Sequence, residues 1–197
     1  MPATLTSADL EILFQNARTL RQWIDRPVED ATLRAIWDLV RLGPTSSNLQ
    51  HGRFVFVKSR AAKERLRPCL AQGNVAQTMA APVTVIACWD RQFADAAADL
   101  LERPEIRNWF AGKPEEAIFV EGFRSATLQA GYLIIAARAL GLDAGPMSGF
   151  DPAKTDAVFF PDGRWRSNFL INLGYGDRDG LRPRAPRFAF DQACRIE

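Results

Sequence analysis

The chain has 197 residues, 47% of them hydrophobic and 24% charged, which is the composition of a globular protein large enough for one sizeable core. Its formal net charge of +2 gives no argument from overall charge for binding to nucleic acid or to a membrane surface. The sequence contains no long linker rich in Gly, Ser, Pro or like charges, so we expect a single domain over residues 1–197.

The first half of the chain predicts helices and two buried strands. Apolar residues recur at helical spacing after Ser7 and after Asp30, and Gly43-Pro44 ends the second helix. In chain order we expect helices that begin after Ser7 and Asp30, a strand at Phe54–Val57, helices at 60–70 and 74–80, and a strand at Val83–Trp89.

One long helix dominates the second half. Pro114 suits the first turn of a helix that runs to Leu140, and this helix is apolar almost all round from Leu128 onward, which predicts a central position or a subunit interface. The other expected elements are short helical pieces within 91–113, a helix that begins at Asp151-Pro152, a strand at Asn168–Leu173 and an extended tail after Gly180. Few strands, many helices and no regular alternation favour an α+β fold with a central sheet flanked by helices.

Targeting and metal-binding signals are missing from the sequence. The stretch MPATLTSADLEILF lacks the basic and long apolar regions of a secretory signal. Gln129 and Arg138 interrupt the most apolar helical segment, so we expect no membrane span and a cytoplasmic location. The three cysteines form no CxxC pair, and the single histidine, His51, excludes a multi-histidine metal site within one chain.

Common motifs for nucleotide binding and hydrolysis are also missing, and four polar clusters remain as candidate sites. There is no GxGxxG after a strand, no GxxxxGK[ST], no HExxH and no GxSxG. The clusters are Arg18-Thr19-Leu20-Arg21, the loop 43–50, the turn 145–151 and the basic tail 182–187.

Each cluster has an ordinary structural explanation beside a functional one. Arg18 and Arg21 could clamp a phosphate, although arginine is also common in the last turn of a helix. The loop 43–50 offers neutral donors and acceptors and equally suits a turn. The turn 145–151 lets the backbone approach a flat ligand, or simply leads a strand into a helix. The tail suits a phosphate-binding arm or a solvated terminus.

Taken in this order, the four clusters resemble the nitroreductase family. Its pattern is an N-terminal arginine-rich run, Pro-Ser-x-x-Asn-x-Gln-Pro-Trp, a Gly-containing turn and a C-terminal Lys/Arg-x-Arg, and the likeness covers nearly the whole chain. The stretches that carry it are Arg18–Arg21, Pro44–Gln50, Gly145–Gly149 and Arg182–Arg184. More narrowly, GPTSSN, GNVAQTMAAPV and NFLINLGYGD resemble the RutE/HadB subgroup, which is linked to reduction of malonic semialdehyde to 3-hydroxypropionate.

The resemblance implies a nitroreductase-like α+β fold, with a central mixed or antiparallel sheet flanked by helices, in an intertwined homodimer. It implies two tightly but non-covalently bound FMN molecules at the dimer interface, each touched by both chains, and NADH or NADPH as the reductant. We expect no metal, and no nucleic-acid or membrane partner.

The resemblance also implies which residues bind FMN. The phosphate and its neighbourhood would be held by Arg18, Thr19, Arg21, Arg182 and Arg184. The flavin would be approached from the other chain by Pro44, Thr45, Ser46 and Asn48. The ribityl chain and pyrimidine edge would be addressed by Asn74 and Gln77, and the ring would lie along Pro146, Met147, Ser148 and Gly149.

Three positions depart from the family pattern. Ala17 stands where relatives often carry the first arginine, which leaves one fewer phosphate contact, and His51-Gly52 replaces the usual Pro-Trp. Gln77 stands where relatives often carry Lys or Arg. A cation there would stabilise negative charge on the reduced flavin, so we expect a lower flavin potential in this chain.

The implied reaction is ping-pong transfer of a hydride from NAD(P)H through N5 of FMN to a small acceptor, most specifically malonic semialdehyde. Solvent can supply the protons, so we expect no obligatory catalytic side chain; His51 is the alternative proton donor near the mouth of the site. The rival functions are a reductase of nitroaromatics, quinones or enones on the same fold, and a flavin-binding protein without turnover.

Overall fold

The computed structural model describes residues 4–197, and a four-stranded sheet with strand order β1-β2-β4-β3 lies at its centre. The strands are β1 (Gly52–Val57), β2 (Val83–Asp90), β3 (Asp143–Met147) and β4 (Trp165–Gly174). Every neighbouring pair is antiparallel, so the α+β expectation is confirmed in its antiparallel form.

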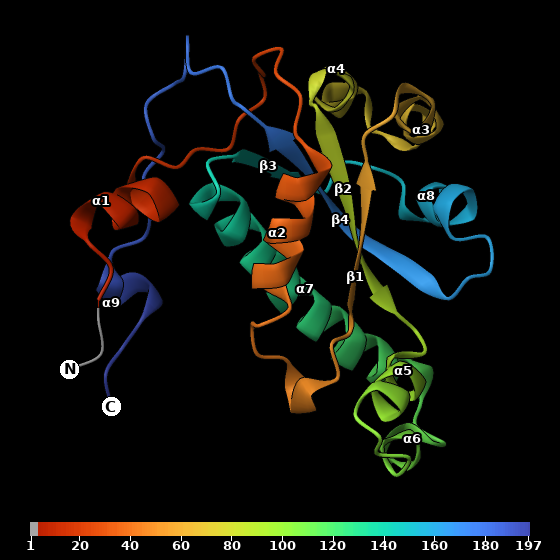
Figure 1. Cartoon of the computed structure of the whole chain (residues 1–197). Helices are drawn as coiled ribbons and strands as arrows, with labels where there is room; N and C mark the ends of the chain where they lie inside the picture. Colours follow the sequence, from red (N-terminus) through yellow and green to blue (C-terminus); the bar gives the residue numbers. More distant parts are fainter. Residues whose placement is uncertain (1–3) are drawn as a thin grey trace.

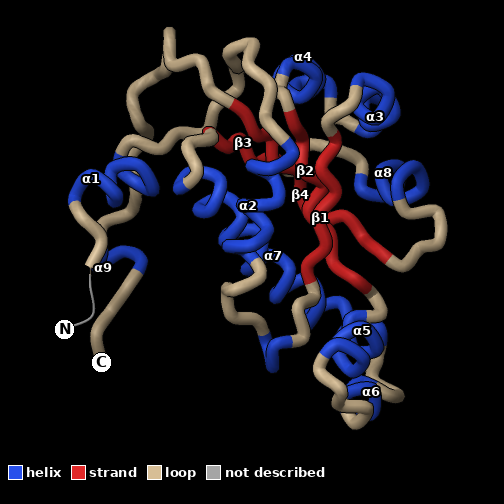
Figure 2. The backbone as a smooth tube through the Cα atoms, viewed as in Figure 1, coloured by secondary structure: helices blue, strands red, loops and turns tan. Residues whose placement is uncertain are grey.

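Helices cover both faces of this sheet (Figures 1 and 2). The helical segments are α1 (Ser7–Leu10), the π-helical turn η1 (Glu11–Gln15), α2 (Asp30–Val40), the 3-10 turns η2 (Ser46–Asn48) and η3 (Arg67–Cys69), α3 (Arg60–Leu66), α4 (Gln72–Ala80), α5 (Phe93–Leu100), α6 (Ile106–Phe110), α7 (Glu115–Ala139), α8 (Pro152–Phe159) and α9 (Phe190–Ala193). Helices α2 and α7 pack on one face, and α3, α4 and α8 lie over the other.

Strand alternation divides the core between the two faces. On β2, Val85 packs with α2 and α7, while the next residue, Ile86, packs with α3 and α8. Because neighbouring side chains on a strand point to opposite faces, a fully buried strand such as β2 must be apolar on both. The continuous apolar run that predicted this strand therefore follows from its central place in the sheet.

Helix α7 confirms the expected long helix to within one residue at each end, with Pro114 at its N-cap. Small buried residues such as Ala130 and Ala137 let it lie close against the sheet, so its central position is confirmed. On the outer side of this helix, 46% of the Leu128 surface is exposed. Among residues 4–197, no helix combines the length and the apolar character needed to cross a bilayer.

Strand β3 was not expected, because Gly145 and Pro146 are unusual in strands. The structure places it at the edge of the sheet. Proline has no N–H to donate, and an edge strand tolerates this because one of its sides has no neighbouring strand to bond. Pro146 pairs with Ile171 of β4. The turn expected at 145–151 therefore begins three residues later, after Met147.

The first helix begins one residue earlier than expected. Thr6, not Ser7, is its N-cap, since the Thr6 hydroxyl accepts from the backbone N–H of Asp9 at 3.2 Å. The Asp9 carboxylate accepts from the Thr6 backbone N–H at 2.8 Å, which completes a capping box. Glu29 likewise takes the N-cap position expected for Asp30.

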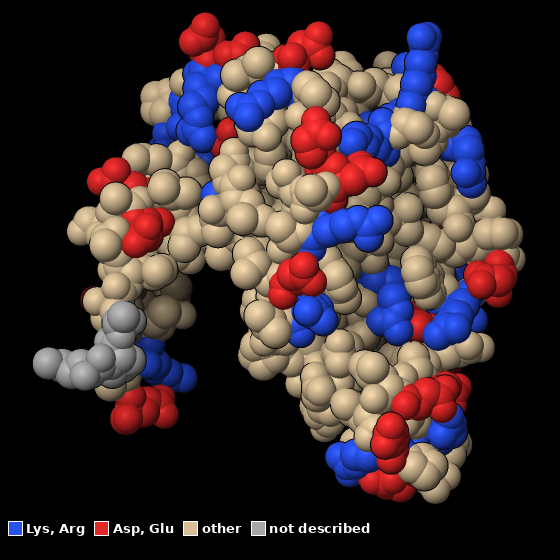
Figure 3. All heavy atoms as spheres, in the orientation of Figure 1, with Lys and Arg blue, Asp and Glu red and all other residues tan. Residues whose placement is uncertain are grey.

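Helices α1 and α9, near the two ends of the described chain, lie side by side and stand off from the body (Figure 1). We call the segment from residue 5 to Asn16 the N-terminal arm. The side chain of Arg184 in the tail donates to the carbonyl oxygens of Gln15 and Ala17, both at 2.7 Å. The tail is mostly extended, as expected, apart from the short helix α9. The space-filling view shows a notch between this arm and the body (Figure 3).

Candidate active site

Two amide side chains on α4 meet the segment that follows β3. Asn74 Nδ2 donates to the carbonyl oxygen of Gly149 at 2.8 Å, and Gln77 Nε2 donates to Asn74 Oδ1 at 2.5 Å. Gln77 Nε2 also lies 3.8 Å from the sulfur of Met147. We call Asn74, Gln77, Met147 and Gly149 the amide cluster. Its members come from two of the sequence-predicted groups, which the fold brings together.

Two glycines here allow close packing within the chain. A Cβ on Gly149 would lie 2.3 Å from Asn74 Nδ2, and a Cβ on Gly145 would lie 2.5 Å from the carbonyl oxygen of Leu20. Side chains never approach so closely, so both glycines let separate segments touch. For Gly145, which is buried, packing against Leu20 explains the residue without a ligand.

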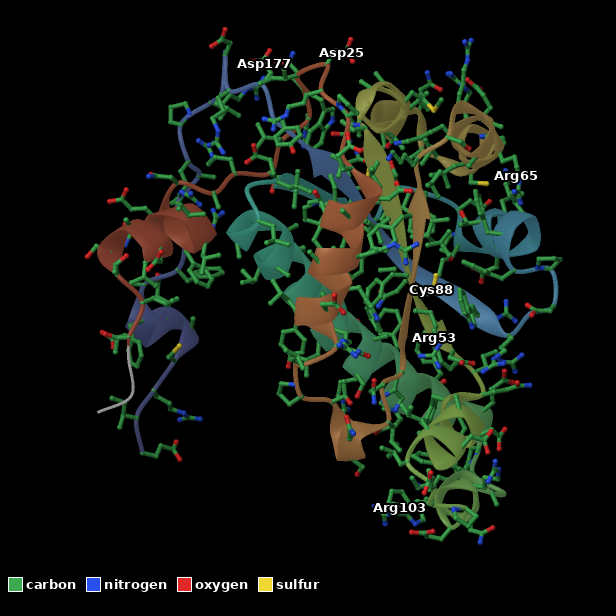
Figure 4. The ribbon with its side chains drawn as sticks, viewed as in Figure 1. Asp25, Arg53, Arg65, Cys88, Arg103 and Asp177 are labelled. Atoms are coloured by element: carbon green, nitrogen blue, oxygen red, sulfur yellow. The ribbon has the colours of Figure 1, made fainter. Side chains whose placement is uncertain are left out.

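The Arg18–Arg21 segment runs beside β3. Thr19 forms a parallel bridge with Ala144, and the indole nitrogen of Trp23 donates to the carbonyl oxygen of Gln77 at 3.2 Å. These contacts set the segment against both β3 and α4. The segments that follow also meet, because Trp23 forms an antiparallel bridge with Gly176. Asp25 and Asp177, just beyond this bridge, are labelled at the upper edge of Figure 4.

The basic tail joins the same region. Arg18 Nη2 donates to the carbonyl oxygen of Arg182 at 2.6 Å, across 164 residues of sequence. Lys and Arg side chains gather at the upper left of Figure 3, near where the arm and tail leave the body. Three of the four clusters predicted from sequence are thus neighbours in one chain: the Arg18–Arg21 segment, the turn after β3 and the tail.

Arg184 contacts the N-terminal arm. One of its terminal nitrogens is committed to backbone carbonyls of the arm, so this arginine braces the chain beside Arg18. Arg138 on α7 also holds the N-terminal arm, because it donates to the carbonyl oxygen of Leu13 at 2.9 Å. Burial lowers the pKa of Arg138, which Asp143 partly offsets. Sequence analysis missed this residue as a candidate, although a lone arginine in an apolar run was the available signal.

The fourth cluster lies elsewhere. The loop Pro44–Asn48 joins the end of α2 to the start of β1, at the end of the strands where Gly52 pairs with Trp89. Helix α4 precedes β2, so it lies at the opposite end of these strands, where Val57 pairs with Thr84. In Figure 1, α4 lies at the top of the molecule, whereas the orange turn that contains η2 lies below α2. One chain therefore does not bring all the predicted residues together.

The Pro44–Asn48 loop has a defined and unusual shape. The hydroxyl of Tyr132 on α7 donates to the carbonyl oxygen of Pro44 at 3.0 Å, and Thr45 Oγ1 accepts from the backbone N–H of Gln50 at 3.2 Å. Ser47 and Asn48 adopt left-handed backbone angles, with φ of 47° and 57°. Such conformations cost free energy for residues other than glycine and persist only where the surroundings hold them.

His51 is not the solvent-facing proton donor that was considered as an alternative. Its side chain is 0% exposed, and its ring lies 4.2 Å from that of Phe93. Burial lowers its pKa to about 4, against an opposing effect of Glu121, whose carboxylate lies 3.7 Å away. Neither ring nitrogen has a hydrogen-bond partner within the described residues. A neutral, enclosed imidazole serves to pack the base of the loop.

The donor set suits an organic anion better than a metal. No group of three or more His, Cys, Asp or Glu side chains suited to a metal occurs within residues 4–197. Asn74 and Gln77 instead offer amide donors and acceptors of the kind that match the edge of a heterocycle, and the Arg18–Arg21 segment offers guanidinium groups suited to phosphate. The residues therefore fit a flat polar ring that carries a phosphate.

The family model for nitroreductases matches residues 15–175 of this chain. The chain belongs to the nitroreductase family. Its relatives include a protein of Burkholderia lata that is 56% identical over 98% of this chain and 99% of its own. Another, from Rhodopseudomonas palustris, is 52% identical over the whole of both chains. Both are named provisionally as NADH dehydrogenase/NAD(P)H nitroreductase.

Solved structures of the nitroreductase family share the fold. A protein of Exiguobacterium sibiricum, described provisionally as a nitroreductase and solved in complex with FMN, superposes with a TM-score of 0.88 at 20% identity over the whole of both chains. One from Bacillus subtilis, described in the same way, gives 0.87 at 23% identity over 98% of this chain and all of its own. At such identities the likeness establishes the fold alone.

Proposed function

We propose that this nitroreductase-family chain is an FMN-dependent NAD(P)H oxidoreductase that works as a homodimer. The observation that carries the proposal is that the Pro44–Asn48 loop and the amide cluster lie at opposite ends of the strands of the sheet. A cofactor that touches both groups must be shared by two copies of the chain. The proposal includes a single domain over residues 1–197, of which 1–3 lie outside the described residues, and a cytoplasmic location.

Each group of residues has a part in holding FMN. The phosphate would be bound by Arg18, Thr19, Arg21, Arg182 and Arg184 of one chain. The ribityl chain and the ring would be met by Asn74, Gln77, Pro146, Met147, Ser148 and Gly149 of the same chain. The second chain would contribute Pro44, Thr45, Ser46 and Asn48. The relative from Exiguobacterium sibiricum, solved with FMN, supports the choice of cofactor.

When bound, FMN would accept a hydride from NADH or NADPH and pass it to a second substrate in a ping-pong sequence. The protein would supply position and electrostatics. Asn74 and Gln77 would hold the cofactor by its polar edge, and the fixed loop of the second chain would limit the space beside the ring. Solvent would supply protons, since His51 is enclosed and neutral at pH 7.

The acceptor we propose first is malonic semialdehyde, reduced to 3-hydroxypropionate, because of the likeness of several sequence stretches to the RutE/HadB subgroup. Nitroaromatics, quinones and enones are the competing acceptors. A panel of kcat/KM values with the purified protein separates them. A value for malonic semialdehyde below that for nitrofurazone would remove it as the preferred acceptor.

Mixed dimers test the shared site directly. In an Asn74→Ala homodimer and in an Asn48→Ala homodimer, both sites carry one damaged residue. A mixed dimer of the two variants, purified through two different tags, has one site with both changes and one site with neither. We expect that dimer to regain FMN in one of its two sites, whereas each homodimer binds weakly.

Two outcomes would overturn the proposal. No regain of flavin in the mixed dimer would mean that the site lies within one chain. Wild-type protein that is purified colourless and does not take up added FMN would remove the cofactor itself. Flavin that binds but is not bleached by NADH or NADPH under nitrogen would instead indicate a flavin-binding protein without turnover.

A further inference from the structure

A lysine lies buried beneath the helix that carries the amide cluster. Lys63 on α3 is only 4% exposed. Its Nζ donates to the carbonyl oxygen of Thr78 on α4 at 2.8 Å and to Thr84 Oγ1 on β2 at 2.5 Å. Lysine is almost never buried without a reason, because removing its charge from water is costly.

No carboxylate pairs with Lys63 among the described residues. Helix α4 contains no charged residue, and the single charged residues of β2 and β4, Asp90 and Arg166, lie at the far ends of those strands. The other charges of α3 are those of Arg60, Glu64 and Arg65. Glu64 is paired with Arg67, and Arg65 lies toward α8, where it donates to the Val158 carbonyl and is labelled in Figure 4. On α8 the charged residues Lys154 and Asp156 pair with Asp151 and Arg166.

Desolvation is therefore unopposed at Lys63. Burial lowers its pKa to about 7, so the ammonium and the neutral amine are both populated near neutral pH. Either form can donate the two hydrogen bonds to Thr78 and Thr84. The fold can thus hold this side chain in place in both charge states.

A short chain of contacts links Lys63 to the amide cluster. Thr78, whose carbonyl accepts from Lys63, directly follows Gln77, and its hydroxyl lies 3.5 Å from the sulfur of Met147. On the other side, Thr84 Oγ1 donates to Asn172 Oδ1 at 2.7 Å. Asn172 is 1% exposed, and its Nδ2 finds no partner within residues 4–197. These groups form a polar layer between the sheet and the proposed flavin site.

We propose that Lys63 takes up a proton when the flavin at the amide cluster is reduced, and so supplies from beneath α4 the positive charge that Gln77 does not provide. The inference rests on the proposed function. Lys63 is a positioning residue, because it does not touch the flavin. Its charge acts on the flavin through helix α4.

The balance of the step is simple. One hydride leaves NAD(P)H and adds two electrons and one proton to the cofactor, which gains one negative charge. One further proton passes from water to the neutral amine of Lys63, which gains one positive charge. In a poorly solvated layer two opposite charges attract far more strongly than in water, so each event favours the other. On reoxidation the lysine returns its proton to solvent.

The test is the pH dependence of the midpoint potential of the FMN-loaded protein, measured against redox dyes. Hydride uptake alone binds one proton for every two electrons. Above pH 7, where Lys63 starts neutral, the wild type should bind two, so the slope of potential against pH should double there. Protonation of the reduced flavin itself would steepen the slope at acid pH, and that pattern alone would contradict the proposal.

Three variants complete the experiment. Lys63→Met removes the charge and should show the single-proton slope above pH 7, with a lower potential than the wild type at pH 7. Lys63→Arg keeps a permanent charge and should also show the single-proton slope, but with a higher potential than Lys63→Met. Lys58→Met, which removes an exposed lysine paired with Asp30, is the matched control and should behave as the wild type.

The outcomes separate this inference from the function on which it rests. Protein that binds no FMN would end both. Protein that binds FMN and turns over, but whose wild-type slope stays at one proton for every two electrons from pH 7 to the alkaline limit, would end the role of Lys63 alone. The wild-type slope decides the matter even if Lys63→Met fails to fold.

Discussion

The side-chain nitrogen of Asn74 lies 2.8 Å from the carbonyl oxygen of Gly149, and the same carbonyl accepts from the backbone N–H of Ala71 at 3.0 Å. These two hydrogen bonds fix the first turn of α4 against the chain that leaves β3. The relative position of Asn74 and the proposed ring-binding segment is therefore set by the protein before any ligand binds.

Gly149→Ala should weaken FMN binding and leave the fold intact. The new Cβ would lie 2.3 Å from Asn74 Nδ2, which is the end of a side chain and can turn away at the cost of its hydrogen bond. The loss of one such bond, about 1 kcal/mol, corresponds to roughly a fivefold rise in Kd. Fluorescence titration of the apoprotein with FMN measures it.

The matched control is Gly73→Ala, one residue before Asn74. A Cβ there meets nothing within 4 Å, and alanine favours a helix more than glycine. This variant should keep its affinity for FMN and gain a little stability. Equal loss of affinity in both variants would show that the Asn74–Gly149 contact has no special role.

Arg18→Ala should reduce the preference for FMN over riboflavin. If the guanidinium of Arg18 faces the phosphate, its removal weakens binding of FMN but not of riboflavin, which lacks that group. One charge-assisted hydrogen bond is worth about 1.5–3 kcal/mol, so we expect roughly a 10- to 100-fold loss for FMN. A parallel loss for both ligands would instead point to a bracing role through Arg182, whose carbonyl accepts from Arg18.

Gln77→Lys should raise the midpoint potential of the flavin. Its amide nitrogen now lies between Asn74 and Met147, so a cation introduced there would stabilise the added negative charge. The measurement is a spectroelectrochemical titration at fixed pH. A potential that does not change would contradict the placement of Gln77 beside the flavin.

His51 should make stability fall in mild acid. Its pKa is lowered by burial to about 4, against 6.5 for an exposed histidine, so the unfolded chain binds a proton that the folded chain does not. Stability is therefore lost as pH falls from about 6.5 to 4, by up to about 3 kcal/mol. His51→Leu should remove this decline, and it sacrifices no hydrogen bond present among the described residues. Urea unfolding at several pH values would show an unaltered decline if the idea is wrong.

Asp90→Asn should destabilise the protein at neutral pH by about 3 kcal/mol, because it breaks a buried ion-pair network. Asp90 is 0% exposed and lies 2.9 Å from Arg53 and 2.8 Å from Arg164. Burial raises its pKa, but the hydrogen bonds from Arg164 and Gln92 and the charge of Arg53 outweigh that effect and leave it below 3.8.

The sign for Asp90 follows from this lowered pKa. The stabilisation is present above about pH 4 and is lost as pH falls through the folded-state pKa, below the range in which His51 acts. Wild type and Asp90→Asn should thus converge in strong acid. An equal difference in unfolding free energy at pH 7 and pH 2.5 would contradict the assignment. Arg53, which belongs to this network, is labelled in Figure 4.

Local patterns were enough to predict the long helix and the central strands. Pro114 marked the start of α7 because its ring suits a first helical turn, and the short apolar run at Val83 predicted a buried strand. Strand β3 was missed because its pairing with β4 overrides the poor strand propensity of Gly145 and Pro146.

The site was harder to predict because its contacts join distant segments. Arg184 contacts Ala17 across 167 residues of sequence, and no local pattern could reveal that contact. His51 looked like an exposed loop residue, because its burial depends on Phe93 in a helix beyond the second strand. Lys63 gave no signal, since a lysine on a short helix is normally exposed.

The left-handed residues of the Pro44–Asn48 loop have one further consequence. Leu49 and His51, both buried, anchor the end of the loop, so its shape is decided when the chain folds rather than when something docks on it. Whatever this surface meets encounters a rigid template and loses little conformational entropy there. Single side-chain substitutions can therefore change what this loop surface binds while its backbone shape is kept. Inserting even one residue would disrupt the whole turn.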